Sequence, residues 1–283
     1  MATDIKRATG LLVIEAVNSN PNGDPDRESS PRQRPNGQGE ISPVSFKRKL
    51  RDLLENESGV LWEALPEKFN SRRDSYAILE SRGRTDEEIT KEIKNGSFTG
   101  KYWDARLFGN TFLETTKTIG KEFIKTGVVQ FGVGVSVSPV TIVYHTNTKK
   151  RGMGSKSAGM APLAFRIVEH GVYCMPFFVN PNFADKSGCT ANDVELLKLL
   201  IPHAYDLNRS AIRPDVRLRH AWYMEHKNSL GSCPEYLLID ALTPVRKSDA
   251  AKASADWSDY EDKTSLSGDL ASKLASVADL MAS

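Results

Sequence analysis

Two carboxylates that could support hydrolysis stand in one loop near the start of the chain. Asp24 and Asp26 occur in the run Asn22-Gly23-Asp24-Pro25-Asp26, which follows a short apolar segment. Carboxylates in a loop beside bound nucleic acid can hold a divalent ion for phosphodiester cleavage. The same run is ordinary turn-forming chemistry, and we favour that interpretation. A metal-dependent endoribonuclease that uses Asp24 or Asp26 therefore remains the alternative hypothesis.

A second candidate site is a basic loop in the middle of the chain. No Asp or Glu occurs from residue 123 to residue 168, a run of 46 residues, although 26% of the whole chain is charged. The basic residues of the loop are Lys149, Lys150, Arg151 and Lys156. Such a cluster can be a solvated hairpin tip, but the long absence of acid indicates contact with a polyanion. Met153, between two glycines, could act as a wedge between bases.

The residues before this loop alternate strictly between apolar and small or polar side chains. Every odd position from Val129 to Val137 is apolar, and the even positions are Gln, Gly or Ser. This alternation predicts a half-buried strand whose other face is nearly bare, so that a ligand could approach its backbone. Gln130 stands on that face where RNA-recognition modules carry aromatic residues. We therefore expect contacts to the sugar–phosphate backbone rather than base stacking on the sheet.

A helix is predicted from Ser42, a suitable N-cap, with Pro43 at the first helical position. Its buried stripe is Phe46, Leu50, Leu53 and Leu54. Lys47 and Arg51, four residues apart, lie on one flank of the stripe, and Lys49 lies on the other. Basic residues along a buried edge can be placed at the rim of a sheet. We therefore predict that these three side chains contact RNA.

The remaining elements complete a mixed pattern. A strand over residues 11–17 is predicted to be buried on both faces, and residues 57–100 read as a helical insertion with a capping box at Thr85. A helical turn is expected over 103–109, a return strand over about 164–179 with a bulge at Gly171, and a helix capped by Thr190. Strands are predicted over 220–225 and 236–242. The basic segment before them adds Arg217 and Arg219 to the candidate RNA contacts.

Without the insertions, the order is strand, helix, strand, strand, helix, strand. That order predicts an α+β, ferredoxin-like fold of the kind that RNA-recognition modules share. We expect one RRM-like domain over residues 1–246, with the helical insertion at about 57–100 and a basic thumb loop at about 139–163. Residues 247–283 hold four Lys against seven Asp or Glu and are predicted to be a flexible acidic tail.

Composition narrows the classes of function further. The formal net charge is only +2, so local patches must carry any electrostatic argument. Three cysteines without a CxxC spacing indicate neither a zinc site nor a disulfide framework, and no motif indicates a cofactor. No signal segment and no apolar run near twenty residues occur, which predicts a cytoplasmic protein that does not enter a membrane.

Six short motifs carry a resemblance to a known family, and they occur in its order. They are residues 18–26, Ser45-Phe46-Lys47 with Arg51, residues 104–109, Val129-Gln130-Phe131-Gly132, residues 151–156 and residues 206–211. Together they resemble the repeated backbone subunit of type I-C CRISPR Cascade, a RAMP-type member of the "Cas seven" family. The resemblance covers about residues 5–245.

The resemblance implies a hand-shaped protein with an RRM-like palm and a thumb β-hairpin around Met153. It implies that several copies form a helical filament along one CRISPR RNA, and that each thumb pushes between nucleotides. A target DNA strand would then pair with the guide in antiviral defence, alongside small, large and guide-end-capping Cascade subunits. Lys47 and Arg51 would occupy backbone-binding positions. Related type III subunits cleave RNA with an Asp in the loop of Asp24 and Asp26, but type I members are not known as nucleases, so no catalytic role is expected.

Overall fold

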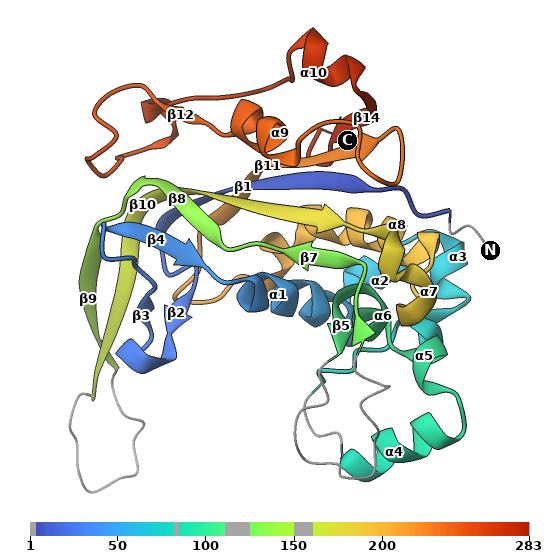
Figure 1. Ribbon diagram of the computed structural model, residues 1–283. Helices are drawn as coiled ribbons and strands as arrows, with labels where there is room; N and C mark the ends of the chain where they lie inside the picture. Colours follow the sequence, from blue (N-terminus) through green and yellow to red (C-terminus); the bar gives the residue numbers. More distant parts are fainter. Residues whose placement is uncertain (1–3, 82–84, 111–124, 150–160, 283) are drawn as a thin grey trace, which may run out of the picture.

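The computed structural model of the protein describes residues 4–81, 85–110, 125–149 and 161–282. Within these ranges the chain forms a mixed α/β fold around a large antiparallel sheet, with the strand order β14-β11-β1-β10-β8-β4 and with β7 and β9 pairing with β10 (Figure 1). Its strands are β1 (Ala8–Ser19), β4 (Gln38–Ile41), β7 (Val129–Phe131), β8 (Gly134–Pro139), β9 (Ile142–Lys149), β10 (Ala161–Val179), β11 (Val216–His226) and β14 (Leu274–Asp279). No helix in the described ranges is both long enough and apolar enough to cross a membrane.

The first strand, β1, is the centre of the sheet. It pairs with β10 on one side and with β11 on the other. Leu11 and Val13 face one apolar cluster while Leu12 and Ile14 face another, and all four are fully buried. A strand covered on both faces needs apolar residues at successive positions. The prediction of a doubly buried strand over residues 11–17 is therefore confirmed.

Two helices, α1 (Pro43–Glu55) and α8 (Ala191–Leu200), pack on one face of the sheet (Figure 1). The Ser42 hydroxyl caps α1 by accepting a hydrogen bond from the backbone N–H of Ser45, with Pro43 at the first position, as predicted. Thr190 and Asp193 form a capping box at the start of α8. The predicted apolar stripe of α1 is buried in the main core cluster, so both helices and their caps are confirmed.

A helical insertion follows α1. Its helices are α2 (Val60–Ala64), α3 (Glu67–Asn70), α4 (Asp86–Lys94), α5 (Phe98–Lys101) and α6 (Trp103–Phe108). The predicted capping box at Thr85 is present, with Glu88 as its partner. Gly109 ends α6 with a φ of 86°, a backbone conformation that a glycine adopts without steric cost. The short strands β5 (Gly109–Asn110) and β6 (Lys125–Thr126) then pair with each other.

The predicted strand over residues 129–137 is two strands, β7 and β8. The interruption lies at Gly132, whose backbone N–H donates to the carbonyl of Pro176, and at Val133, which is 41% exposed. One extra residue shifts which face each later side chain points to, so Ser136 and Ser138 are buried. The Ser136 hydroxyl accepts a hydrogen bond from the N–H of Gly39, and Ser138 contacts the Tyr260 hydroxyl at 2.7 Å. The expected bare face is therefore covered by the protein itself.

The predicted bulge at Gly171 is absent, because the register between β10 and β1 runs without a break from Ala8↔Val179 to Ser19↔Val168. The glycine has a packing reason instead. A Cβ at Gly171 would lie 2.8 Å from Cγ1 of Val140, closer than two carbon atoms can approach.

The C-terminal part of the chain covers the other face of the sheet (Figure 1). It contains α9 (Glu235–Leu242), β12 (Val245–Arg246), β13 (Tyr260–Glu261), α10 (Gly268–Ser272) and β14. The predicted strand over 236–242 was wrong: buried Leu238 and Leu242 lie four residues apart, which is the spacing of a helix face. Residues 274–279 pair with β11 and extend the sheet, so the structure differs from the predicted flexible tail.

The strands β9 and β10 form a hairpin that extends from the sheet on the side of α1 and the helical insertion (Figure 1). Their register runs from Ile142↔Val168 to Lys149↔Ala161. The predicted loop residues Lys150, Arg151, Met153 and Lys156 lie outside the described residues, as does the side chain of Lys149. Near the hairpin, the loop after β1 forms β2 (Gly23–Asp24) and β3 (Ser30–Pro31), which pair with each other.

Candidate nucleic-acid interface

Among the basic residues of α1, Lys47 is the strongest candidate for contact with an anion. Its ammonium lies 5.0 Å from the centre of the Phe108 ring, and its side chain is half-buried. Burial lowers the pKa of Lys47, and the neighbouring Arg51 charge lowers it further, while Glu80 acts in the opposite direction. No carboxylate in the described part of the chain forms an ion pair with it. An anion brought to this flank of α1 would stabilise the charged form of Lys47 and act against the lowering of its pKa.

Lys49 lies on the opposite flank of α1, as predicted. Burial lowers its pKa and the nearby Arg213 charge lowers it further, although Asp52 lies 3.8 Å from its ammonium and opposes the shift. Arg213 donates from Nε to the carbonyl oxygen of Asn20, which holds it in place beside Lys49. Arg213 was not among the predicted RNA contacts. The sequence indicated Arg213 only through its place in the basic segment before β11. Its proximity to Lys49 could not be predicted, because the two residues are far apart in the chain.

Arg51 does not lie at the rim of the sheet, which corrects the expected placement. Its side chain is 3% exposed, with Nε 2.8 Å from Oδ2 of Asp104 and Nη1 3.0 Å from Oε2 of Glu80. The Asp104 carboxylate also accepts hydrogen bonds from the backbone N–H groups of Leu79 and Glu80. Arg51 therefore joins α1 to the helical insertion, and its burial keeps the guanidinium away from the surface where a phosphate would bind.

The structure places Arg217 and Arg219 away from the lysines of α1. Both guanidinium groups contact the buried carboxylate of Glu15, at 3.6 Å and 2.8 Å. Arg219 also lies 4.8 Å from the ring of Trp257, which belongs to the C-terminal segment on the other face of the sheet. Arg217 makes a second pair with Asp215. Acids of the same chain thus neutralise both predicted contacts.

Gln130 and Asp24 are engaged in local structure. The Gln130 amide donates to the carbonyl oxygen of Gly127. Asp24 caps the turn after β2 by accepting a hydrogen bond from the N–H of Asp26, and it lies 3.7 Å from Arg32. Within the described ranges, no three or more His, Cys, Asp or Glu side chains are arranged to hold a metal ion. The loop over residues 22–26 therefore has the geometry of a turn, the interpretation that we favoured over a metal site.

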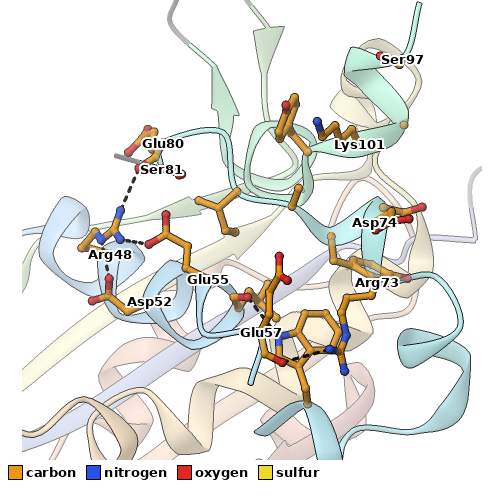
Figure 2. A pocket seen from close by; sticks show the side chains of 18 of the residues that line it. Arg48, Asp52, Glu55, Glu57, Arg73, Asp74, Glu80, Ser81, Ser97 and Lys101 are labelled. Carbon is orange, nitrogen blue, oxygen red and sulfur yellow. Dashed lines mark hydrogen bonds and ion pairs between the residues drawn. The ribbon is translucent and has the colours of Figure 1, made fainter. Parts of the chain in front are cut away.

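An open groove of about 1540 Å³ lies between α1 and the helical insertion (Figure 2). Its charged lining side chains are Arg48, Lys49, Arg73 and Lys101 with Asp52, Glu55, Glu57, Asp74 and Glu80. Figure 2 shows Arg48 held by the carboxylates of Asp52 and Glu55 and by the carbonyl of Glu80. Because its acids outnumber its bases, the groove as a whole does not suit a polyanion, and of its lining residues only the partly neutralised Lys49 stays a candidate phosphate contact.

Comparison with known proteins identifies the family. The family model described as "CRISPR-associated protein Cas7" matches residues 6–265. The chain belongs to the Cas7 family. The resemblance to the "Cas seven" family is therefore confirmed, whereas the type I-C subtype stays a prediction.

A curated Cas7-family relative, "CRISPR-associated protein Cas7" of Haloferax volcanii, is 26% identical over 217 residues. That match covers 70% of this chain and 64% of the relative, so it spans slightly less than two thirds of the relative's length. Two similar solved structures belong to a "CRISPR RNA-guided surveillance complex, pre-nicking" and a "CRISPR RNA-guided surveillance complex". Their TM-scores are 0.46 and 0.40, and they are 14% and 16% identical. The alignments cover 76% and 75% of this chain, and 77% and 68% of the two solved chains.

Proposed function

We propose that this chain is a non-catalytic, cytoplasmic backbone subunit that binds CRISPR RNA and presents it for pairing with target DNA. Copies of the chain line up along one guide in a helical filament, with small, large and guide-end-capping subunits of a type I-C Cascade as further partners. The observation that carries this proposal is the Cas7 family match over residues 6–265.

The arrangement of the sheet supports an RRM-like palm. The strands β11, β1, β10 and β8 are neighbours in that order, and α1 and α8 pack on one face. A chain with the order strand, helix, strand, strand, helix, strand gives this arrangement when each helix crosses back over the same face. The β9–β10 hairpin, together with the basic loop that follows β9 in the sequence, is our proposed thumb, and Met153 is the proposed wedge between nucleotides.

The electrostatics of α1 support contact with a phosphate backbone. Lys47 has a lowered pKa and no ion pair in the described part of the chain, and Lys49 is only partly neutralised. Each site is small, but a filament repeats it along one RNA, so that modest contacts become one multivalent interaction. A net charge of +2 per chain is then sufficient.

The test is the salt dependence of RNA binding by the full chain. Each lost phosphate contact lowers the slope of log affinity against log salt by about 0.7 for single-stranded nucleic acid. Lys47→Ala with Lys49→Ala should therefore flatten the slope by about 1.4 for each subunit, equally for all RNA sequences. Lys150→Ala with Arg151→Ala tests the proposed thumb in the same way.

The matched control is Lys68→Ala, which removes an exposed lysine of α3 that is already paired with Glu195. Its slope should equal that of the unmodified chain. If the α1 double variant also keeps the full slope, the assignment of these lysines is wrong. Mass and nucleic-acid content of the particle purified from its own host test the class: one discrete RNA in a large particle is expected, and a bare monomer contradicts the proposal.

A further inference from the structure

The base of the β9–β10 hairpin exposes an aromatic ring that the fold does not use. Tyr144 on β9 is 70% exposed. Among large apolar side chains exposed in the described ranges, Tyr144 and Tyr236 are the aromatic ones. A ring of this size left in water loses the free energy that its burial would contribute. A second surface that covers the ring would recover that energy.

An arginine covers one side of this ring. Arg166 is the cross-strand partner of Tyr144, and its guanidinium carbon lies 5.2 Å from the centre of the ring. The guanidinium edge is held by the carbonyl oxygen of Arg27, at 3.1 Å, and by the carboxylate of Glu28. These contacts fix the position of Arg166 against the ring, so the exposed surface of Tyr144 is its other side.

The pair faces the same side of the sheet as α1. Ile142 and Val168 are cross-strand partners two residues nearer the sheet, and both pack in the cluster that holds Phe46 of α1. Side chains two residues apart on a strand share a face. Tyr144 and Arg166 therefore continue the α1 face outward along the hairpin, beyond the point where the apolar core ends.

The chemistry of the pair and the composition of its stretch of chain favour nucleic acid as the partner, because the carboxylate beside the pair, that of Glu28, is already bound by Arg166. Tyr144 lies within the 46-residue stretch that contains no Asp or Glu, and the same strand leads to the basic loop. A planar aromatic ring backed by a fixed guanidinium is the surface on which unpaired bases stack, because every base presents a flat π-face. A protein partner would instead be expected to meet a larger apolar patch than one ring.

We propose that Tyr144, held by Arg166, forms a stacking platform for one unpaired nucleobase of the bound RNA. This inference rests on the proposed function and adds a base contact at the foot of the hairpin to the phosphate contacts of α1. It is also distinct from the wedge expected at Met153, which is nine residues further along the sequence. We expect the platform to bind without preference for a particular base, since every base can stack on a ring.

The test compares two probes for the full chain: an oligouridylate, and an oligomer of equal length whose bases are replaced by abasic sites. The measured quantity is the ratio of the dissociation constants for abasic and normal RNA. Tyr144→Ala should lower this ratio by about ten-fold, the scale of one stacked base. Tyr144→Trp keeps a flat ring and should retain it, and Arg166→Lys should give an intermediate loss because the planar backing is gone.

The control is Tyr236→Ala, which removes a ring of similar exposure, 62%, from α9 on the other face of the sheet. It should leave the ratio unchanged. The salt slope of Tyr144→Ala should equal that of the unmodified chain, because stacking releases no counterions.

The outcomes separate this inference from the proposed function. If the lysine variants of α1 flatten the salt slope but Tyr144→Ala leaves the ratio unchanged, the stacking platform is wrong and the backbone role stands. If Tyr144→Ala weakens both probes equally, or reduces assembly of the chain without RNA, the ring meets protein and the inference is overturned. If the unmodified chain binds neither probe, both proposals fail.

Discussion

Two regions of this protein hold positive charges in opposite ways. At the junction of α1, α6 and α8, Arg51 and Arg106 are buried and each is paired with a buried aspartate, Asp104 or Asp193. On the flank of α1, Lys47 keeps its ammonium half-buried without an ion pair in the described part of the chain. The first arrangement buries each charge against a carboxylate, whereas the second leaves a charge that an external anion would stabilise.

A basic residue beside the apolar stripe of a helix has two possible roles, and its partner decides between them. Arg51 and Lys47 are one helical turn apart on the same flank of α1. Arg51 meets the carboxylate of Asp104, while Lys47 meets the ring of Phe108. A carboxylate completes a buried ion pair that joins two elements of the fold. A ring supports a cation but does not neutralise it.

The largest expected effect comes from breaking the buried pair. Asp104→Ala should lower the free energy of unfolding by about 3–5 kcal/mol, because it leaves Arg51 buried without its carboxylate and removes the acceptor of the Leu79 N–H. Urea denaturation measures the loss. Asp185→Ala, at an exposed position in α7 (Ala184–Ser187), is the control and should change stability by less than about 0.5 kcal/mol.

Removing both charges sharpens this result. Arg51→Met with Asp104→Leu should cost less than Asp104→Ala alone, since no unpaired charge remains in the interior. If the double variant is as unstable as the single one, the packing of Asp104 rather than its charge holds the insertion to α1.

A smaller effect is expected at the second buried pair. Arg106 binds both oxygens of Asp193 and also donates to the carbonyl groups of Thr99, Gly100 and Ser75. Arg106→Lys keeps the charge but cannot reproduce this fork, so a loss of about 2–3 kcal/mol is expected in the same assay. The matched change Arg209→Lys, at an exposed pair with Asp206, should be nearly neutral; equal losses at the two sites would show that the fork geometry is unimportant.

His220 is a cation whose charge is lost by deprotonation as the pH rises. It lies between Asp279, at 2.6 Å, and Asp262, at 3.0 Å, and these contacts raise its pKa despite partial burial. A raised pKa means that the contribution of His220 is fully present below its unfolded pKa and is lost as pH rises through the folded pKa. The chain should therefore lose stability as the pH rises above the ordinary histidine pKa of about 6.5 and through the raised pKa of folded His220, and His220→Asn should remove this part of the pH dependence. Denaturation midpoints across the range test it; an unchanged slope in His220→Asn would falsify the assignment.

The smallest effect is expected at a pair in water. Lys68 and Glu195 are joined at 2.6 Å, but both side chains are 46% exposed. Solvent screening reduces such a pair to about 0–1 kcal/mol. Lys68→Ala should therefore hardly move the urea midpoint, and a loss comparable to that of Asp104→Ala would remove the distinction between interior and surface cations.

Much of the local structure could be predicted from the sequence because its signals are short-range. Ser42 with Pro43, Thr85 with Glu88, and Thr190 with Asp193 each identify a helix start within a few residues. The burial of β1 on both of its faces could likewise be predicted from its continuous apolar run. The predictions failed where the local sequence was compatible with two kinds of secondary structure. Residues 236–242 suit a strand or a short helix, and only the packing of Leu238 and Leu242 on the sheet selects the helix.

The candidate site was predictable in part. Lys47 and Lys49 were placed correctly on opposite flanks of α1, since the helical repeat alone fixes their directions. Arg219 was not, because its neutralising partner Glu15 comes from another strand. The Tyr144–Arg166 pair was also missed: the two residues are brought together by the hairpin register, which the spacing between them does not reveal.

By itself, the sequence determined where helices begin, which stripe of α1 is buried, and that one long stretch carries no acid. Those properties depend on neighbours a few residues away and on composition. The tertiary structure alone decided which cations are neutralised, which face of β8 is covered, and that the last residues complete the sheet. Each of these depends on partners far apart in the chain, whose meeting is set by the packing of the whole core rather than by any local pattern.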